Sequence, residues 1–89
     1  MFDLNKKLFN YLQKMNKDYL EVEDMEEIFG SIIELNDEYG WRSVEAIWVD
    51  DDYNLIASTM DEDGEEYEED INLTFEETKL LEKWLDNQF

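Results

Sequence analysis

The ten residues from Asp61 to Asp70 include eight carboxylates and no basic side chain, and this run restricts the fold more than any other feature of the chain. Burying a charged group without a partner is very costly, so most of the run must lie on the surface. Within it, Asp63-Gly64 is typical of a two-residue hairpin turn. The run therefore predicts an exposed hairpin that presents negative charge to the solvent.

Around this hairpin, β-branched and aromatic residues with a period of two predict a three-stranded antiparallel meander. Its strands are expected at residues 41–49, at residues 53–60, and from residue 65 or 66 to residue 73, with Asp50-Asp51-Asp52 as the first turn. Alternation along the last strand defines two faces: Tyr67, Ile71 and Leu73 on one, and Glu66, Glu68 and Asp70 on the other.

The first strand of the meander fits two registers. Either Val44, Ala46 and Trp48 or Ile47 and Val49 can form its buried face. Because a shift of one residue exchanges the two faces of a strand, the sequence leaves this register open.

Apolar residues with a helical period predict three helices around the sheet. The first begins at an Asp3 cap, ends at about Asn16 and has one apolar stripe, formed by Leu4, Leu8, Leu12 and Met15. The second begins between residues 19 and 24 and ends near residue 35, so that Gly30 lies inside it at a cost of about 1 kcal/mol relative to Ala. The third begins at a capping box, Thr74 with Glu77, and faces inward through Leu80, Leu81, Trp84, Leu85 and Phe89.

The predicted fold is a single α+β domain over residues 1–89, with helices packed against the meander in the order ααβββα. Aromatic residues make up 15% and hydrophobic residues 43% of the chain, which is too much apolar material for a disordered acidic tail. The net charge is nevertheless −19, and Arg42 is the only basic residue among 22 acidic ones between residues 21 and 78. Self-repulsion of this size opposes folding, so we expect a positively charged partner.

The residue types exclude most enzyme chemistry. Without Cys or His, the hydroxyl groups have no adjacent base, and the isolated glycines form no phosphate loop. Asp50, Asp52, Asn54 and Asp61 match part of a calcium loop, but Leu55 occupies the position that requires Gly. We therefore expect no catalysis, no cofactor and no dedicated metal site. With no long apolar segment and an anionic surface, we expect a cytoplasmic protein that binds neither membranes nor nucleic acid directly.

The density of negative charge instead suggests imitation of nucleic acid. Duplex DNA carries one charge per roughly 1.7 Å of axis, and rows of carboxylates on a strand repeat every ~6.8 Å. A partner with a Lys/Arg-lined groove would meet these candidate residues: Asp50, Asp51, Asp52, Asp61, Glu62, Asp63, Glu65, Glu66, Glu68, Glu69 and Asp70. Glu34, Asp37 and Glu38 are weaker candidates. Neighbouring aromatic side chains, Tyr53, Tyr67, Trp41 and Trp48, are candidate anchors for such an interface.

In size, charge and lack of catalytic groups, the whole chain resembles the small acidic DNA mimics that phages make as anti-CRISPR and anti-restriction proteins. That resemblance implies a stoichiometric inhibitor that blocks the DNA-binding or PAM-reading cleft of a nuclease in the host cytoplasm, acting as a monomer or small homo-oligomer. Two alternatives remain open. One is a bacterial immunity protein that neutralises a basic toxin nuclease. The other is an acidic structural or interaction module, which predicts an apolar patch near the two tryptophans of the first strand.

Overall fold

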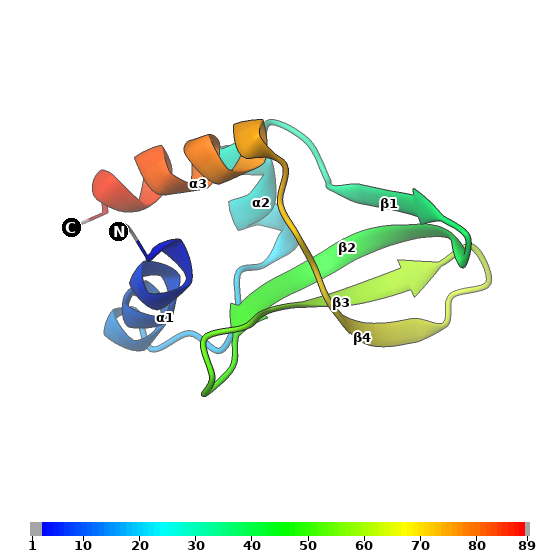
Figure 1. Cartoon of the computed structure of the whole chain (residues 1–89), viewed down its shortest axis with the longest axis horizontal. Helices are drawn as coiled ribbons and strands as arrows, with labels where there is room; N and C mark the ends of the chain where they lie inside the picture. Colours follow the sequence, from blue (N-terminus) through cyan, green and yellow to red (C-terminus); the bar gives the residue numbers. More distant parts are fainter. Residues whose placement is uncertain (1–2, 89) are drawn as a thin grey trace.

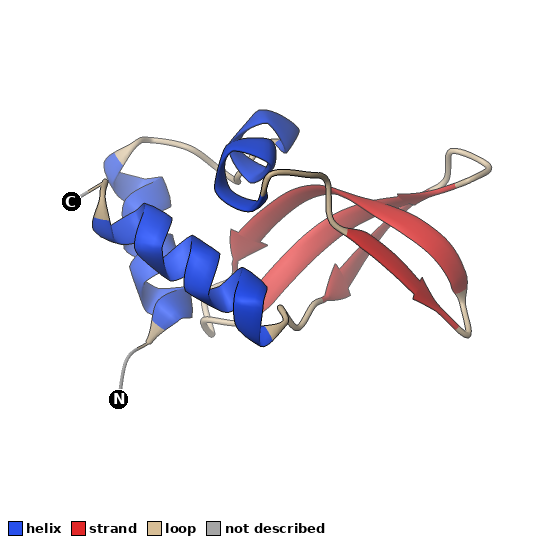
Figure 2. Ribbon diagram, turned by 90° about the horizontal axis from the view of Figure 1, so that it is seen from above, coloured by secondary structure: helices blue, strands red, loops and turns tan. Residues whose placement is uncertain are grey.

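Helices gather at one end of a four-stranded antiparallel sheet in the computed structural model, and the other end of the sheet projects beyond them (Figures 1 and 2). The structure describes residues 3–88. Within them the elements are α1 (Leu4–Lys14), α2 (Val22–Phe29), β1 (Glu34–Asp37), β2 (Gly40–Val49), β3 (Leu55–Asp61), β4 (Glu66–Asp70) and α3 (Phe75–Asp86). The strands lie in the order β1-β2-β3-β4. The predicted α+β class is therefore confirmed, with one strand more than the three expected.

The two helix starts with strong local signals are confirmed. Asp3 caps α1, and its side chain accepts a hydrogen bond from the backbone N–H of Lys6 at 3.1 Å. Thr74 caps α3 by accepting from the N–H of Glu77 at 3.1 Å, while the Glu77 carboxylate accepts from the N–H of Thr74 at 2.9 Å. Both caps satisfy backbone donors that have no partner within their helix.

The expected end of the second helix is wrong. Gly30 is not inside the helix but is its C-cap, in the left-handed conformation with φ of 80°. Its N–H bonds to the carbonyl of Glu26 at 2.8 Å, and its left-handed backbone ends the helix at Phe29. The chain that is freed in this way forms β1, which pairs with the start of β2 from Glu34↔Ser43 to Asp37↔Gly40.

A β-bulge at Glu45 resolves the register of β2. Val44 pairs with Thr59, but Ala46 pairs with Ser58, so Glu45 is the extra residue. The bulge puts Val44 on the same face as Ile47 and Val49, all three in the hydrophobic core. Both patterns seen in the sequence were therefore partly right, since the alternation changes phase in the middle of the strand.

The core lies between the helices and the end of the sheet that they cover. The side chains of Leu8, Leu20, Met25 and Ile47 are fully buried there, and Leu20 and Ile47 exchange two backbone hydrogen bonds of 2.8 and 3.2 Å. In α3, Leu81 and Leu85 are buried and Trp84 is half-buried, as predicted, but Leu80 is 43% exposed and not inward-facing. Phe89 lies outside the described residues.

Two turns at opposite ends of β3 are built in the same way. The β3–β4 loop has three residues, Glu62 to Gly64, and not the two expected, because Asp61 pairs with Glu65 through a 3.0 Å backbone bond. Its last residue, Gly64, has φ of 83°, and Tyr53 at the same place in the β2–β3 loop has φ of 63°. Both are the left-handed third residue of a three-residue hairpin.

Candidate functional site

The face of the sheet that points away from the hydrophobic core is called the open face here. Its side chains follow from the strand register, because directly paired residues project from the same side of a sheet. The rows Trp48–Ile56–Asp70, Ala46–Ser58–Glu68 and Ser43–Met60–Glu66 cross three strands. The remaining members are Glu34, Asn36, Trp41 and Glu45.

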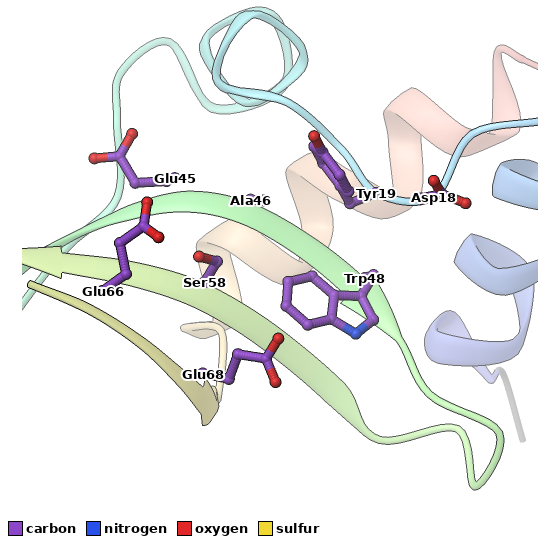
Figure 3. Close-up of a pocket in the computed structure, with 8 residues that line it drawn as sticks. All are labelled: Asp18, Tyr19, Glu45, Ala46, Trp48, Ser58, Glu66 and Glu68. Atoms are coloured by element: carbon purple, nitrogen blue, oxygen red, sulfur yellow. The ribbon is translucent and has the colours of Figure 1, made fainter.

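Five of these open-face residues are carboxylates and none is basic. Part of the face is hollowed into a groove of about 570 Å³, which residues of the α1–α2 connection, Asp18 and Tyr19, close on one side. Figure 3 shows Glu45, Glu66 and Glu68 around this groove, together with the Trp48 ring. Glu66, Glu68 and Asp70 are exposed and follow one another on β4 at every second residue, a repeat of about 6.8 Å.

Both tryptophans of β2 lie on the open face, and both are half-buried. The indole N–H of Trp41 donates to the Glu34 carboxylate at 3.1 Å, which fixes the ring beside that acid. Trp48 pairs with Ile56 across the strands and packs at the border of the core. Half-buried tryptophans give the acidic face flat apolar surface that a partner can cover.

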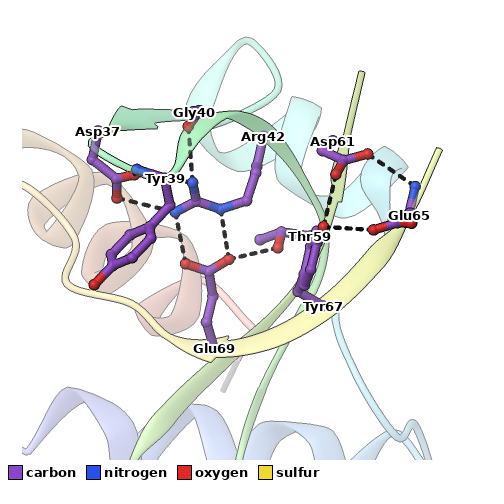
Figure 4. Close-up of polar contacts among 9 residues, drawn as sticks. All are labelled: Asp37, Tyr39, Gly40, Arg42, Thr59, Asp61, Glu65, Tyr67 and Glu69. Atoms are coloured by element: carbon purple, nitrogen blue, oxygen red, sulfur yellow. Dashed lines mark hydrogen bonds and ion pairs between the residues drawn. The ribbon is translucent and has the colours of Figure 1, made fainter. Parts of the chain in front are cut away.

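The opposite face carries the only basic side chain of the sheet. Arg42 is 5% exposed, and its five N–H groups donate five hydrogen bonds. Asp37 accepts two of them, both at 3.0 Å, and Glu69 accepts two, at 2.8 and 2.9 Å. The fifth goes to the carbonyl of Gly40 at 2.8 Å. The guanidinium is therefore fully used inside the protein (Figure 4).

This ion-pair network joins all four strands, because the buried hydroxyl of Thr59 on β3 also donates to Glu69, at 2.6 Å. Hydrogen bonds from Arg42 lower the pKa of both carboxyls, Asp37 and Glu69. The same bonds raise the pKa of the arginine. Both acids are thus held in the charged form at neutral pH, and on this face two carboxylates share one guanidinium.

The predicted site residues fall into three groups. The first is the β2–β3 turn, with Asp50, Asp51 and Asp52. The second is the β3–β4 turn, with Asp61, Glu62, Asp63 and Glu65. The third is β4, where Glu66, Glu68 and Asp70 share the open face, as predicted, while Glu69 faces the other way and pairs with Arg42. The two turns lie at opposite ends of β3, a strand of seven residues, so about 23 Å separates them.

Within the two turns, the first aspartate is part of the loop structure. The Asp50 carboxylate accepts the backbone N–H groups of Asp52 and Asn54, both at 2.9 Å. Asp61 does the same for Asp63 and Glu65 at 3.0 Å, and it also accepts from the Tyr67 hydroxyl at 2.8 Å. Backbone hydrogen bonds from Asn54 chiefly lower the pKa of Asp50, and the Tyr67 bond chiefly lowers that of Asp61. Asp51, Asp52, Glu62 and Asp63 are exposed at the tips of the turns, whereas the Glu65 carboxylate lies 2.9 Å from the Tyr67 hydroxyl.

Sequence reasoning missed Glu45 as a member of the acidic surface. In a regular strand Glu45 and Ala46 would point to opposite sides, and only the bulge brings both to the groove. Glu34, a weaker candidate, joins the open face once β1 pairs with β2. No local signal in the sequence predicts the bulge or the pairing of β1 with β2, since both depend on contacts between strands.

Neither a metal site nor a membrane span stands out in residues 3–88. No three acidic side chains in this part of the chain are grouped so that they could hold a metal ion. None of its helices combines the length and the apolar character needed to cross a bilayer. Comparison of the chain with protein-family models, curated proteins and solved structures gave no match.

Proposed function

We propose that this protein is a non-enzymatic inhibitor whose open face occupies the Lys/Arg-lined cleft in which a host defence nuclease, such as a CRISPR effector or a restriction enzyme, binds DNA. One observation carries the proposal: five carboxylates and two tryptophans share a face that has no basic side chain. Arg42 lies on the opposite face, where it is paired with Glu69 and Asp37. No basic side chain of the sheet neutralises the open face, so a cationic partner would be attracted to it.

The physical basis of binding would be charge, with aromatic contact as the anchor. A nuclease cleft that binds DNA is lined by Lys and Arg, and electrostatic attraction of this kind steers association and weakens with salt. The row on β4 repeats its charge every ~6.8 Å on a hydrogen-bonded strand, so little ordering entropy is lost on binding. Trp48 and Trp41, which lie near the two ends of β2, would add apolar area to the contact.

The test is a charge reversal on β4, E66K/E68K/D70K. Inhibition of DNA cleavage would be measured with purified nucleases: a CRISPR effector, a restriction enzyme and a basic toxin nuclease. A matched control, E23K/E26K/E76K, changes the net charge equally but on exposed residues of α2 and α3. We expect loss of inhibition by the β4 variant only, and a fall in wild-type affinity as salt rises. Equal inhibition by wild type and the β4 variant would refute the proposal.

The choice of nuclease also separates the defence inhibitor from the immunity protein, because both would use the same surface. Inhibition of the toxin nuclease alone would favour the second. Circular dichroism of each variant shows whether a loss of inhibition comes from the surface or from unfolding.

A further inference from the structure

The outer edge of the sheet at β4 is not covered. β4 is the last strand of the sheet, and its only neighbour is β3 (Figure 1). Its five residues pair without a bulge, and they include no Pro and no Lys, which commonly protect exposed edges. Negative charge is the one protection that this edge has.

Hydrogen-bond register decides which backbone groups point outward from this edge. Asp61 with Glu65 and Leu55 with Ile71 are hydrogen-bonded pairs at the two ends of the ladder. In an antiparallel ladder bonded and non-bonded pairs alternate, so the intervening bonded residues of β4 are Tyr67 and Glu69. The N–H and C=O groups of Glu66, Glu68 and Asp70 therefore face away from β3.

These outward-facing residues are the ones whose carboxylates lie on the open face. A strand added beside β4 would bond to the backbone of Glu66, Glu68 and Asp70 and would place a side chain directly opposite each carboxylate, ~5 Å away between Cβ atoms. A basic side chain at each of these positions would form a cross-strand ion pair. The intervening side chains would lie beside Tyr67 and Glu69, and Glu69 is already paired with Arg42.

We infer that β4 binds an extended segment of the partner by strand addition, and that this segment carries Lys or Arg at every second residue. The inference rests on the proposed function, since it uses the same three carboxylates, and adds the mode of recognition: backbone pairing supplies register and alternate charges supply specificity. A second copy of this chain is a poor occupant, because β4 against β4 would set acids against acids.

The probes are peptides of identical composition. The first alternates, Lys-Thr-Lys-Thr-Lys-Thr-Lys, and the second is its block permutation, Lys-Lys-Lys-Lys-Thr-Thr-Thr. Isothermal titration at an ionic strength of about 0.1 M gives the affinities, and NMR hydrogen exchange reports on single amides. We expect the alternating peptide to bind at least about tenfold more tightly. We also expect it to slow exchange of the amides of Glu66, Glu68 and Asp70, with no slowing in E66K/E68K/D70K.

Backbone methylation separates strand addition from simple charge attraction. In the added strand the lysine N–H groups would face β4 and the threonine N–H groups would face away. Methylating the lysine backbone nitrogens should therefore abolish the amide protection and the preference, whereas methylating those of the threonines should preserve both.

Three results would overturn the inference: equal affinity for both permutations, full binding after methylation of the lysine nitrogens, or no binding of the alternating peptide. None of them touches the proposed function. That proposal fails only if charge reversal on β4 leaves nuclease inhibition unchanged.

Discussion

The carboxylates on the two faces of the sheet differ in whether they are paired with a basic side chain. Toward the core side, Glu69 and Asp37 share one buried arginine, and all five guanidinium N–H groups are bonded. On the open face, none of the five carboxylates is in an ion pair within residues 3–88. Both faces belong to the same strands, and neighbouring residues of β4 contribute to each.

The difference teaches what folding requires and what it does not. A carboxylate that leaves water must be paired, because an unpaired buried charge is very unfavourable. An exposed carboxylate needs no partner because water solvates it, and the carboxylates of the open face have no basic side chain of the sheet beside them. The arginine network is thus accounted for by stability, whereas the acidic row costs stability through repulsion and needs another reason to exist.

Removing Arg42 should have the largest effect, because it breaks the ion-pair network with Asp37 and Glu69. In R42M, Asp37 and Glu69 lose their cation while remaining close together, and we expect the urea midpoint to fall several times further than in T59V, which removes a single hydrogen bond to Glu69. R42K should rescue little, because a lysine supplies a point charge and cannot bond two carboxylates and a carbonyl with a planar fork. Urea unfolding followed by tryptophan fluorescence measures both.

Exposed Lys83, at the end of α3, offers a control for the loss of one positive charge. K83M should leave the midpoint nearly unchanged. A loss in K83M as large as that in R42M would mean that net charge, and not the network, sets the stability.

Neutralising Glu69 should destabilise the protein in a pH-dependent way. At pH 7 we expect E69Q to lose about 1–2 kcal/mol, because charge-assisted hydrogen bonds to Arg42 become neutral ones. The pKa of Glu69 is lowered from 4.5 in the folded protein, so the charged form stabilises the fold above that pH, and the contribution is lost as the pH falls through the lower folded value.

The stabilities of wild type and E69Q should therefore converge as the pH falls below 4.5 and through the lowered pKa of the folded protein. Unfolding curves between pH 3 and pH 7 follow this convergence. A difference between the two proteins that stays constant with pH would contradict the assignment of the stabilisation to the ionised Glu69.

What the sequence could predict depends on how local each signal is. The Asp3 cap, the Thr74 capping box and the alternation of Glu66, Glu68 and Asp70 involve residues within a few positions of one another, and the structure confirms them. Apolar residues after Gly30 keep a helical spacing, so nothing local distinguishes a longer helix from a break. Only the pairing with β2 makes residues 34–37 a strand.

The candidate site shows the same division. The row on β4 could be predicted from the alternation of its residues. Alternation also puts residue 69 on the opposite face of the strand, but it could not predict that Glu69 would pair with Arg42 there. The arginine contacts depend on four strands meeting, and the bulge at Glu45 depends on the register between two of them. Long-range pairing of this kind leaves no periodic trace in one sequence.

Thr59 tests the network more gently. T59V removes the buried hydroxyl that donates to Glu69 and keeps the side-chain shape, so the expected loss is about 1 kcal/mol, the usual net value of one hydrogen bond. In an E69Q background the same substitution should cost less, because the acceptor is already neutral. Full additivity of the two substitutions in urea unfolding would show that the two side chains do not act together.

The smallest change in stability, and the one of opposite sign, is expected on the open face. E66Q/E68Q/D70N removes three like charges, so we expect a gain of a few tenths of a kcal/mol per relieved pair, largest at low salt. Because charge is also what keeps the β4 edge from pairing with another copy, this variant should self-associate as its concentration rises, while E23Q/E26Q/E76Q should not. Analytical ultracentrifugation at several concentrations distinguishes them. A triple variant that stays as monomeric as wild type, with no gain in stability, would mean that the open-face charges neither repel one another nor protect the edge.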